Sequence, residues 1–565
     1  MDKKITGSEA MLKTLIAEGV DTIFGYPGGQ VIPLYDSLYD YQDKLKHILV
    51  RHEQGATHAA QGYARVSGKV GVALVTSGPG ATNTITGIAD AMMDSTPIVV
   101  ISGQVPSPLL GSDAFQEIDV IGITQPITKW AYQIRKPEEI AWAVSRAFYI
   151  ASSGRPGPVV LDFAKDAQVG TFDYTYEKVG FIRSYQPIPD IEEERIAEAA
   201  ALINQAKKPF ALVGQGVILS GAEKELAAFL EKADIPAGST TLGLSAMPSD
   251  YRLNKGMLGM HGNVGPNRKT NECDVLIAIG MRFDDRVTGN LQTYARQAKI
   301  IHLDIDLSEI GKNVPVHVPV LGDAKQTLAA LTEQLNPARH TEWIASFEPD
   351  EKEEYTKVIE REVFPADDRL LQMGEIIRRV SEATDNKAVL VTDVGQNQMM
   401  GVRYFKYSQT RSVVTSGGLG TMGFGLPAAI GAKFGAPDRT VCLFVGDGGL
   451  QMTLQELGTI MQEKLDVKII VLNNHFLGMV RQWQELFFDK RYSGTSMDNP
   501  DFVAIARAYG MGSRVIETRS QLDAAIAEML AHKGPYVLVA NVETHGMVYP
   551  MVPAGGSITD IIMGE

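Results

Sequence analysis

The segment Gly446-Asp447-Gly448-Gly449 decides the fold class of this chain, because it follows an apolar run at 440–445 that is typical of a buried parallel strand. The pair Asn473-Asn474 follows a second apolar run at 467–472. Residues 454–464 between them have helical composition and spacing, so the whole segment predicts a strand–helix–strand unit. Both polar clusters would then lie at the carboxyl ends of neighbouring parallel strands, where open α/β sheets bind ligands.

The residues of these two clusters suit a magnesium ion. An aspartate carboxylate, an asparagine carbonyl and glycine-rich backbone supply oxygen ligands, and Mg²⁺ commonly combines one or two protein carboxylates with substrate phosphate oxygens. Gly-Asp-Gly by itself is more often a plain strand-to-helix turn. The spacing to the asparagine pair and a second, distant motif weigh against that simpler interpretation.

The bulk composition narrows the class of protein. The chain has 565 residues, 44% hydrophobic and 21% charged, which predicts about three or four globular domains. Its net charge of −14 argues against nucleic acid and anionic membranes as partners. Two cysteines allow neither a disulfide framework nor a cysteine-based zinc site. With no signal-peptide pattern and no apolar stretch of about 18 residues, we expect a soluble cytoplasmic protein.

Three α/β blocks are expected, at 1–168, 191–334 and 371–545, followed by a tail at 546–565 that could close over a site. Each block predicts a doubly wound parallel sheet. The first repeats the order found around Asp447, with strands at 71–77 and 97–102 separated by a Gly-Pro-Gly turn and a helix, so these two blocks are interpreted as a related pair. The central block has strands at 210–213, 274–279 and 299–304. Of the two polar linkers, 169–190 and 347–368, the second predicts a solvated helix or loop.

A second candidate site follows the strand at 48–50, where Arg51-His52-Glu53 opens an alanine-rich helix. Glu53 has a structural interpretation, as a first-turn acid that complements the helix dipole. It also has a functional one, because a desolvated carboxyl can share a proton with a ring nitrogen.

Taken together, these motifs resemble the catalytic subunits of acetohydroxyacid synthases (acetolactate synthases), which are thiamin-diphosphate enzymes. The resemblance covers almost the whole chain, and Met479-Val480 and Trp483 narrow it to this family. The segments that carry it are Phe24-Gly-Tyr-Pro-Gly-Gly29, Arg51-His-Glu-Gln-Gly-Ala56, Thr76-Ser-Gly-Pro-Gly-Ala-Thr-Asn83, Asp113-Ala-Phe-Gln-Glu117, Asp393-Val-Gly-Gln396, Ser416-Gly-Gly-Leu-Gly-Thr-Met-Gly423, Gly446-Asp-Gly-Gly449 and Asn473-Asn474.

The resemblance implies a pyrimidine-binding first domain, a central FAD-binding Rossmann-like domain and a diphosphate-binding third domain. Magnesium would be held by Asp447, Asn474 and the carbonyl of Phe476. Met422 would wedge beneath the cofactor, although a core-filling methionine is the commoner structural role. The implied thiamin-diphosphate residues are Pro27, Glu53, Asn83, Val394, Gly395, Gln396, Asn397, Gly420, Met422, Gly446, Asp447, Gly448, Gly449, Asn474, Gly478 and Met479.

FAD is implied chiefly by the segment 282–289, which composition alone also allows to be a solvated charged loop. Gly214-Gln-Gly216 lacks the third glycine of a dinucleotide fingerprint and is weak by itself. In the family the flavin is structural and not redox-active. The implied FAD residues are Arg155, Gly214, Gln215, Gly216, Thr241, Leu242, Met260, His261, Gly280, Met281, Arg282, Asp284, Arg286, Val287, Asp304, Ile305, Asp306, Gly322 and Asp323.

The implied reaction decarboxylates pyruvate on thiamin diphosphate and joins the hydroxyethyl unit to a second 2-ketoacid. Pyruvate gives 2-acetolactate and 2-ketobutyrate gives 2-aceto-2-hydroxybutyrate, in the first common step of valine, leucine and isoleucine biosynthesis. Glu53, Gly29 and Gln116 are the expected catalytic residues, with Glu53 bonded to the aminopyrimidine N1′. The expected substrate contacts are Phe115, Gln116, Lys165, Arg286, Val480 and Trp483.

The family architecture implies a homodimer or homotetramer with each site between two subunits, and a separate small regulatory subunit. Asn397 stands where the family usually has histidine, and Gln30 where many members have alanine. Alternative interpretations are a pyruvate oxidase or 2-ketoacid decarboxylase of the same plan, a FAD-free catabolic acetolactate synthase, and a noncatalytic binding protein that keeps the fold.

Overall fold

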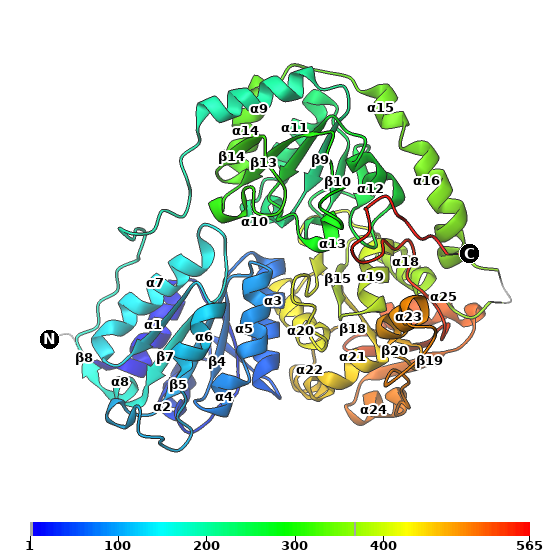
Figure 1. Cartoon of the computed structure of the whole chain (residues 1–565). Coiled ribbons are helices and arrows are strands. Elements are labelled where there is room, and N and C mark those ends of the chain that lie inside the picture. The colour runs from blue at the N-terminus through cyan, green and yellow to red at the C-terminus, as the bar shows by residue number, and fades with distance from the viewer. Residues whose placement is uncertain (1–3, 367–368, 565) are drawn as a thin grey trace.

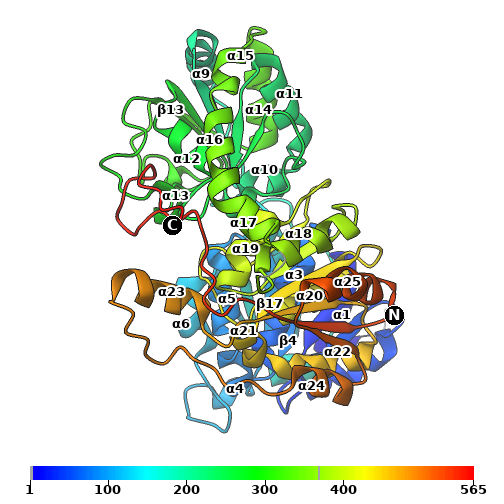
Figure 2. The same cartoon turned by 90° about the vertical axis from the view of Figure 1, so that its right-hand side faces the viewer.

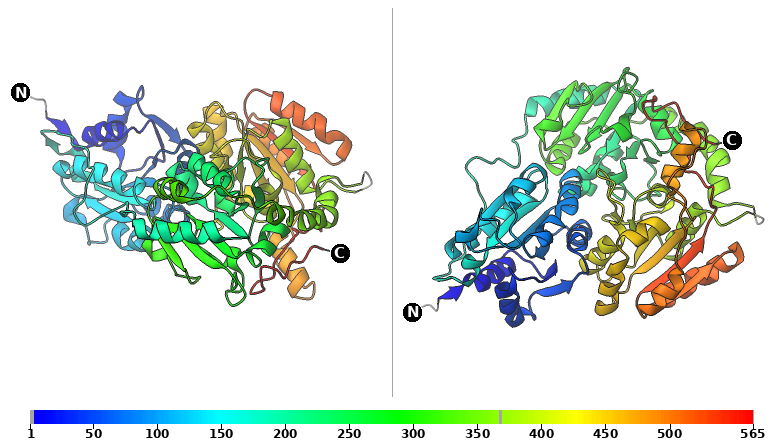
Figure 3. Two further views of the ribbon diagram at one scale, coloured as in Figure 1. Left: turned by 90° about the horizontal axis from the view of Figure 1, so that it is seen from above. Right: turned by 60° about the horizontal axis from the view of Figure 1, so that its bottom comes forward.

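Three six-stranded parallel sheets, each between layers of helices, form the corners of a triangle in the computed structural model (Figure 1). The structure describes residues 4–366 and 369–564. Seen from above, the central domain lies over the junction of the other two (Figure 3). In spatial order the strands are β3 (Lys46–Leu49), β2 (Thr22–Gly25), β4 (Gly71–Val75), β5 (Ile98–Gln104), β7 (Val159–Ala164) and β6 (Trp130–Ile134) in the first sheet; β11 (Asn254–Met257), β10 (Ala237–Ser239), β9 (Pro209–Val213), β12 (Val275–Ile279), β13 (Lys299–Asp304) and β14 (Val318–Leu321) in the central sheet; and β16 (Val413–Val414), β15 (Val389–Thr392), β17 (Val441–Gly446), β18 (Lys468–Asn473), β20 (Tyr536–Asn541) and β19 (Gly512–Ile516) in the third.

Strand order separates the sheets into two kinds. Numbered within each domain, the first and third sheets share the order 2-1-3-4-6-5, whereas the central sheet has the order 3-2-1-4-5-6 of the dinucleotide-binding fold. The prediction of three doubly wound parallel sheets is confirmed. The shared order also explains why the first and third blocks repeat one pattern in sequence.

The cofactor motifs fall where the strand order reverses, which is where a doubly wound sheet opens a ligand crevice. The reversal lies between β2 and β4, between β9 and β12, and between β15 and β17. The segments that follow these strands are 26–29 and 76–83, 214–216 and 280–287, and 394–397 and 446–449. The topology therefore brings each pair of distant motifs to one sheet edge.

Helices cover both faces of every sheet (Figures 1 and 2). The unit around Asp447 differs from its prediction in two details. The expected helix at 454–464 begins as a 3₁₀ turn, and a further short helix, α21, starts at Asp447 itself. The principal helices are α1 (Gly7–Ala17), α2 (Ile32–Leu38), α3 (Glu53–Ser67), α4 (Pro79–Thr82), α5 (Ile85–Met93), α6 (Val120–Thr124), α7 (Ile140–Ser152) and α8 (Lys165–Val169); α9 (Glu193–Gln205), α10 (Gln215–Ser220), α11 (Glu223–Ala233), α12 (Val264–Thr270), α13 (Asp285–Thr288), α14 (Ala324–Gln334) and α15 (Thr341–Ala345); and α18 (Met373–Ala383), α19 (Gln396–Tyr404), α20 (Gly425–Gly435), α21 (Asp447–Met452), α22 (Leu457–Glu463), α23 (Gly478–Phe487), α24 (Phe502–Ala508) and α25 (Leu522–Ala531).

The first and third domains are joined through helices α3 and α20, which lie against each other in Figure 2. A Cβ atom on Gly62 would lie 2.0 Å from the carbonyl oxygen of Ala428, and one on Gly431 would lie 1.8 Å from that of Ala59. Such distances exclude a side chain, so the two backbones meet directly. One hydrophobic core runs from the first sheet through this contact into the third.

The linker at 347–368 is helical but is not simply solvated. It forms α16 (Glu348–Glu354), a π-helical turn (Tyr355–Ile359) and α17 (Glu360–Val363), and its end at 367–368 lies outside the described residues. Glu354 is buried, where it forms an ion pair with Arg403 and accepts hydrogen bonds from Asn263 Nδ2 (2.8 Å) and Val264 N (2.7 Å). The prediction of a solvated segment was therefore wrong for this face, since charge density in sequence does not tell which acids find buried partners.

The C-terminal tail runs from the third domain to the central domain. Gln482 of α23 forms two hydrogen bonds with the backbone of Val548. Its Oε1 accepts from Val548 N at 2.8 Å, and its Nε2 donates to Val548 O at 3.1 Å. Further along, Val552 N donates to Met260 O at 2.8 Å, and Asn290 N donates to Gly556 O at 2.9 Å. Within the described ranges, no helix has both the length and the apolar character to cross a bilayer.

The contact between α3 and α20 predicts a strong dependence on small residues. We expect Gly431→Val to destabilise the protein by at least about 1–3 kcal/mol, because overpacking a tight interior forces backbone shifts. Urea unfolding, followed by far-ultraviolet circular dichroism, measures the change. Gly180→Val is the matched control, since nothing lies within 4 Å of the added Cβ there. Equal unfolding midpoints for the two variants would contradict the proposed packing constraint.

Candidate functional site

Asp447 begins α21 at the carboxyl end of β17 and is almost fully buried, with 1% of its surface exposed. Burial raises the pKa of its carboxyl, and bonds from Asn499 Nδ2 (2.6 Å) and Gly448 N (3.0 Å) partly offset that rise. Asn499 also donates to Asn473 Oδ1 at 2.9 Å. Asn499 thus joins the ends of β17 and β18, a role that the sequence did not indicate because the residue lies far along the chain in a loop.

Asn474 lies beside Asp447 at the end of β18 and is fixed by two contacts. Its Nδ2 donates to Gln396 Oε1 at 3.1 Å, and its Oδ1 accepts from Phe476 N at 3.2 Å. A Cβ on Gly478 would lie 2.1 Å from Gln396 Oε1, so only glycine leaves room for this amide pair. The residues expected at the metal and the diphosphate are therefore brought together from β15, β17 and β18.

Asp393, which precedes the predicted diphosphate segment, holds the surrounding turns together. Its buried carboxylate accepts hydrogen bonds from Val394 N (2.9 Å), Gly423 N (3.0 Å) and Gly425 N (2.8 Å). Burial raises its pKa and these three donors oppose the rise. The sequence placed Asp393 in a motif but gave it no role. Its carboxylate fixes the turn that follows Met422 and the start of the segment 394–397.

Asn397, the departure from the family pattern, faces the same crevice. Its Nδ2 donates to Val394 O at 3.0 Å and lies 3.4 Å from the Cβ position of Gly446. Its Oδ1 is buried and finds no hydrogen-bond partner in the part of the chain that the structure describes. A buried acceptor left over between the two strand ends marks a place for a hydrogen-bond donor or a cation.

In the first domain, Glu53 is the first residue of α3, as the helix-dipole interpretation expects, and it also belongs to a polar cluster. Its Oε2 accepts from Asn83 Nδ2 at 3.0 Å, and its Oε1 lies 3.6 Å from the Cβ position of Gly80. Glu456 of the third domain accepts from Arg51 N and His52 N, both at 3.0 Å. Burial raises the pKa of Glu456 to about 7. This carboxyl, which the sequence analysis missed, fixes the turn that leads into Glu53.

The remaining predicted residues of the first domain line the same sheet edge. Lys165 Nζ donates to Gly29 O at 3.0 Å. Gln116 has a left-handed backbone with φ of 60°, and its carbonyl oxygen lies 2.9 Å from the Cβ position of Gly78. Phe115 beside it is 84% exposed, and Pro27 lies in the loop after β2. The structure thus gathers Gly29, Gln116 and Lys165 around the crevice between β2 and β4.

A cavity of about 850 Å³ lies between the three domains and collects most of the predicted FAD residues. Val394, Gly395, Gly420, Met479 and Trp483 also line it, so it extends to the thiamin segments of the third domain. Two predicted FAD residues are not part of the lining. Gly214 packs against the lining residue Gly280, because a Cβ on Gly214 would lie 2.1 Å from Gly280 O. Asp306 accepts a hydrogen bond from the lining residue Arg155. The predicted FAD residues in its lining are Arg155, Gln215, Gly216, Thr241, Leu242, Met260, His261, Gly280, Met281, Arg282, Asp284, Arg286, Val287, Asp304, Ile305, Gly322 and Asp323.

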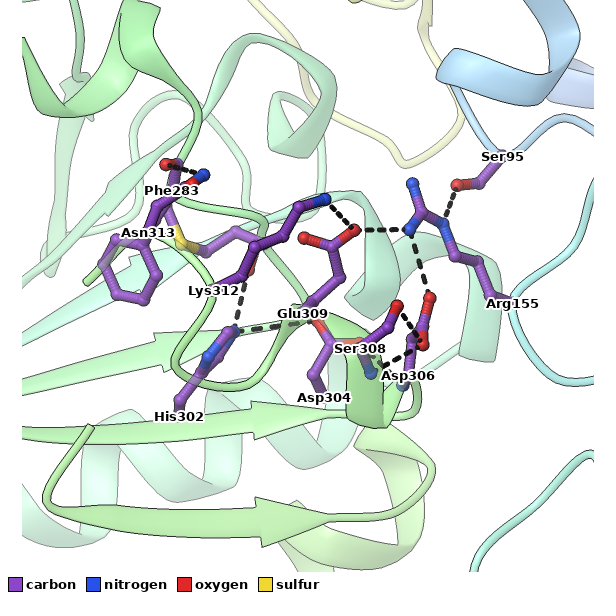
Figure 4. Close-up of polar contacts among 11 residues, drawn as sticks. Ser95, Arg155, Phe283, His302, Asp304, Asp306, Ser308, Glu309, Lys312 and Asn313 are labelled. Atoms are coloured by element: carbon purple, nitrogen blue, oxygen red, sulfur yellow. Dashed lines mark hydrogen bonds and ion pairs between the residues drawn. The ribbon is translucent and has the colours of Figure 1, made fainter. Parts of the chain in front are cut away.

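An ion network holds one end of this cavity (Figure 4). Arg155 Nη1 donates to Glu309 Oε1 at 2.7 Å and to Asp306 Oδ2 at 3.2 Å, and its Nε donates to Ser95 Oγ at 2.9 Å. Burial opposes the charge of Arg155, but the bonds to Glu309 and Asp306 raise its pKa. Burial also raises the pKa of Asp304 to about 6. Ser95 and Glu309 line the cavity and were missed, because single polar residues near strand ends carry no distinguishing sequence signal.

The predicted substrate residues fall into two groups within one chain. Arg286 and Trp483 line the cavity, while Val480, on the same helix as Trp483, is 49% exposed. Phe115, Gln116 and Lys165 belong to the first-domain crevice, and neither they nor Glu53 line the cavity. A single chain therefore presents two separate sets of the expected active-site residues.

Comparison with known proteins covers the same three domains. Family models match residues 5–123 as the N-terminal TPP binding domain of a thiamine pyrophosphate enzyme, residues 196–331 as its central domain and residues 393–540 as its C-terminal TPP binding domain.

Three relatives that match over nearly their whole length are named acetolactate synthase large subunits. The chain is 43% identical over 570 residues to the acetolactate synthase large subunit of Haemophilus influenzae, covering 100% of this chain and 99% of that protein. It is 43% identical over 559 residues to the acetolactate synthase isozyme 2 large subunit of Escherichia coli K12, covering 99% of each. It is 44% identical over 572 residues to a probable acetolactate synthase large subunit of Methanocaldococcus jannaschii, covering 98% of this chain and 95% of that protein. The chain therefore belongs to the thiamine pyrophosphate enzymes and, within them, to the acetolactate synthase large-subunit family.

Proposed function

We propose that this chain is the catalytic subunit of an acetolactate synthase that uses thiamin diphosphate, Mg²⁺ and FAD. It joins the two-carbon unit left by decarboxylation of pyruvate to a second pyruvate or to 2-ketobutyrate. The observation that carries the proposal is the cavity in which Arg286 and Trp483 lie together with the flavin and thiamin segments, in a chain related end to end to acetolactate synthase large subunits.

The third-domain residues fit a magnesium diphosphate. Asp447, the side-chain oxygen of Asn474 and the carbonyl of Phe476 would hold the metal, in keeping with the preference of Mg²⁺ for a few oxygen ligands plus phosphate. In the described ranges no three His, Cys, Asp or Glu side chains form a metal-binding group, so a site here needs amide, backbone and phosphate oxygens. Gly395 and Gly420 have φ of 110° and 67°, and beside their Cβ positions only single side-chain atoms come within 4 Å, which leaves the backbone open to the diphosphate.

The cavity fits a flavin dinucleotide. Its volume of about 850 Å³ lies in the upper part of the range for cofactor sites. Gly216 and Gly280 bring β9 and β12 together, since a Cβ on Gly280 would lie 2.6 Å from Gly216 Cα. This is the switch point of the central sheet, where a dinucleotide is expected. Asp304 and Asp323 lie in the lining at the ends of β13 and β14, placed to accept hydrogen bonds from ribose hydroxyls.

Bound thiamin diphosphate supplies the electron sink for decarboxylation. Asn83 orients the carboxyl of Glu53, which would share a proton with the aminopyrimidine N1′ of the bound cofactor. Arg286 lines the cavity with a largely exposed side chain, and its guanidinium would bind the carboxylate of the acceptor ketoacid. Trp483 favours the larger acceptor by contact with its extra methyl group, a preference worth about 1–3 kcal/mol.

The division of the expected residues supports at least a homodimer, with each active site formed by the Glu53 cluster of one subunit and the Asp447 cluster of another. A homotetramer is the larger alternative. The relatives are named large subunits, which supports a separate regulatory subunit for this chain as well. The alternatives of an oxidase, a decarboxylase or a FAD-free synthase differ from this proposal in their product or in their flavin requirement.

The proposal predicts a product and a cofactor requirement. Flavin-stripped protein given pyruvate, thiamin diphosphate and Mg²⁺ should form acetolactate only after FAD is added, because the cavity walls belong to all three domains. Acetolactate is measured by acid conversion to acetoin. Formation without FAD would indicate the catabolic class, and acetaldehyde or acetate in its place would contradict the carboligase assignment.

Replacing the carboxyl of Glu53 tests the proton relay. We expect Glu53→Gln to lower kcat by about 100-fold or more with little change in the KM for pyruvate, because general acid–base groups contribute about 10²–10⁴-fold. Steady-state kinetics measure both constants. Glu193→Gln is the matched control, since Glu193 likewise begins a helix, α9. Near-normal turnover of Glu53→Gln would leave the helix-dipole role as the better explanation.

The position of Asn397 between the ends of β15 and β17 leads to a binding prediction. Asn397→Asp should weaken thiamin diphosphate binding by about tenfold or more, because it places a negative charge beside the diphosphate. Asn397→His should stay within a few-fold of the native chain, since histidine is the residue that the family usually carries there. Cofactor titration at fixed Mg²⁺ gives the dissociation constants. Unchanged binding of the aspartate variant would show that position 397 does not face the diphosphate.

A further inference from the structure

One loop belongs to both proposed cofactor sites. The segment Ser416-Gly417-Gly418-Leu419-Gly420-Thr421, here called the glycine loop, precedes Met422, and its residues 417–420 line the flavin cavity. A Cβ on Gly417 would lie 2.9 Å from Leu242, and one on Gly418 would lie 3.3 Å from Arg282 Nη2. The loop is therefore packed against the central domain on the side opposite its own sheet.

Two acids of the first domain hold the glycine loop. Asp94, at the C-terminus of α5, accepts from Gly417 N at 2.8 Å and from Gly418 N at 2.7 Å. Asp90, one turn earlier, accepts from Ser416 Oγ and, at 3.0 Å, from Thr421 Oγ1. Both carboxylates are buried, at 0% and 1% exposure for Asp90 and Asp94. The loop in turn closes on itself, because Thr421 N donates to Ser416 Oγ at 2.9 Å, and its own domain adds a bond from Gln398 Nε2 to Ser416 O at 2.7 Å.

The charge balance of this cluster makes the loop and the acids depend on each other. Arg65 forms an ion pair with Asp94, through Nη2 to Asp94 Oδ2 at 2.7 Å. Asp90 Oδ2 is buried and lacks a hydrogen-bond partner among the described residues, and burial raises the pKa of Asp90 to about 6. Buried carboxylates are tolerated only where donors surround them. Displacing the glycine loop would remove four of those donors at once.

The same turn of chain also reaches the flavin end of the cavity. Ser95, directly after Asp94, has φ of 53° and accepts from Arg155 Nε at 2.9 Å. Arg155 in turn bonds Asp306 and Glu309 of the central domain (Figure 4). A continuous polar path therefore runs from the glycine loop through the Asp90–Ser95 segment to the wall of the cavity.

We propose that the segment 90–95 couples the two cofactor sites, so that FAD and magnesium thiamin diphosphate each strengthen the binding of the other. The inference rests on the proposed function for the identity of the two ligands. Asp94 acts as a positioning residue, because it holds the loop and does not itself line the cavity. The physical basis is that the loop borders both sites, so a ligand that favours one position of the loop in one site also favours that position in the other.

Binding linkage measures the coupling directly, without turnover. The full-length, flavin-stripped protein is titrated with FAD by flavin fluorescence, with and without saturating thiamin diphosphate and Mg²⁺. We expect FAD to bind about 5- to 150-fold more tightly when thiamin diphosphate is present, the usual range for coupled sites. By reciprocity, FAD must tighten thiamin diphosphate binding by the same factor.

The variants locate the coupling in the 90–95 segment. Asp94→Asn presents an amide N–H to the donors of Gly417 and Gly418, and it should reduce the linkage to about twofold or less while both cofactors still bind. Ser95→Ala removes only the hydroxyl that meets Arg155 and should reduce the linkage in the same direction. Asp162→Asn is the control, because Asp162 is an equally buried acid of the same domain, bonded to Ser102, Gln104 and Gln133. Its linkage should equal that of the native chain.

The outcomes separate the inference from the proposed function. If native protein binds both cofactors independently, or if Asp94→Asn and Ser95→Ala both keep the full linkage, the coupling role is wrong. If Asp94→Asn does not fold by circular dichroism, Ser95→Ala decides alone, since it changes no buried charge. If native protein binds no FAD, the proposed function fails instead.

Discussion

The backbone contact between α3 and α20 is the constraint on which the site geometry depends. The contact requires Ala59, Gly62, Ala428 and Gly431 to present bare backbone to one another. Helix α3 begins at Glu53, and α20 follows directly on Met422 and the glycine loop. Because the two helices cannot slide without a steric clash, the contact sets the distance between the first-domain crevice and the loop of the third domain.

Buried carboxylates hold the turns that regular secondary structure leaves without support. Asp393 binds the backbone N–H groups of Val394 and of two residues after Met422, Asp94 binds two in the glycine loop, and Glu456 binds two before Glu53. A charged acceptor makes stronger bonds to N–H groups than a neutral one, and in a buried site these bonds are not weakened by water. The acids of this interior thus fix loop conformation, and two of them do so across a domain boundary.

The two proposed cofactor regions are physically continuous in this architecture. The cavity that suits a flavin is closed on one side by the segments that suit the diphosphate, and the tail from the third domain lies along the central domain beside Met260. The proposed flavin could contribute in such a place without a redox task, since it would fill the space between three domains whose relative positions determine where Arg286 and Trp483 lie.

The sequence by itself determined the three parallel sheets, the relation between the first and third domains, and the strand ends that carry the motifs. These features follow from local patterns: apolar runs of strand length, glycine turns and helix periodicity. The resemblance to a known family added the residues of each site, and the structure gathers Glu53 with Asn83, and Asp447 with Asn474 and Gln396, as strand order requires.

Only the tertiary structure decided which residues from different domains meet. Nothing in the sequence paired Asp90 and Asp94 with residues more than three hundred positions away. Asn499, Glu456 and Glu309 are ordinary polar residues until folding places them against Asp447, Arg51 and Arg155. Local sequence patterns determine the helices and strands, because the backbone hydrogen bonds of each element join residues a few positions apart in a helix or neighbouring strands in one sheet. Contacts between domains depend on how whole elements pack, and that information is spread over the entire chain.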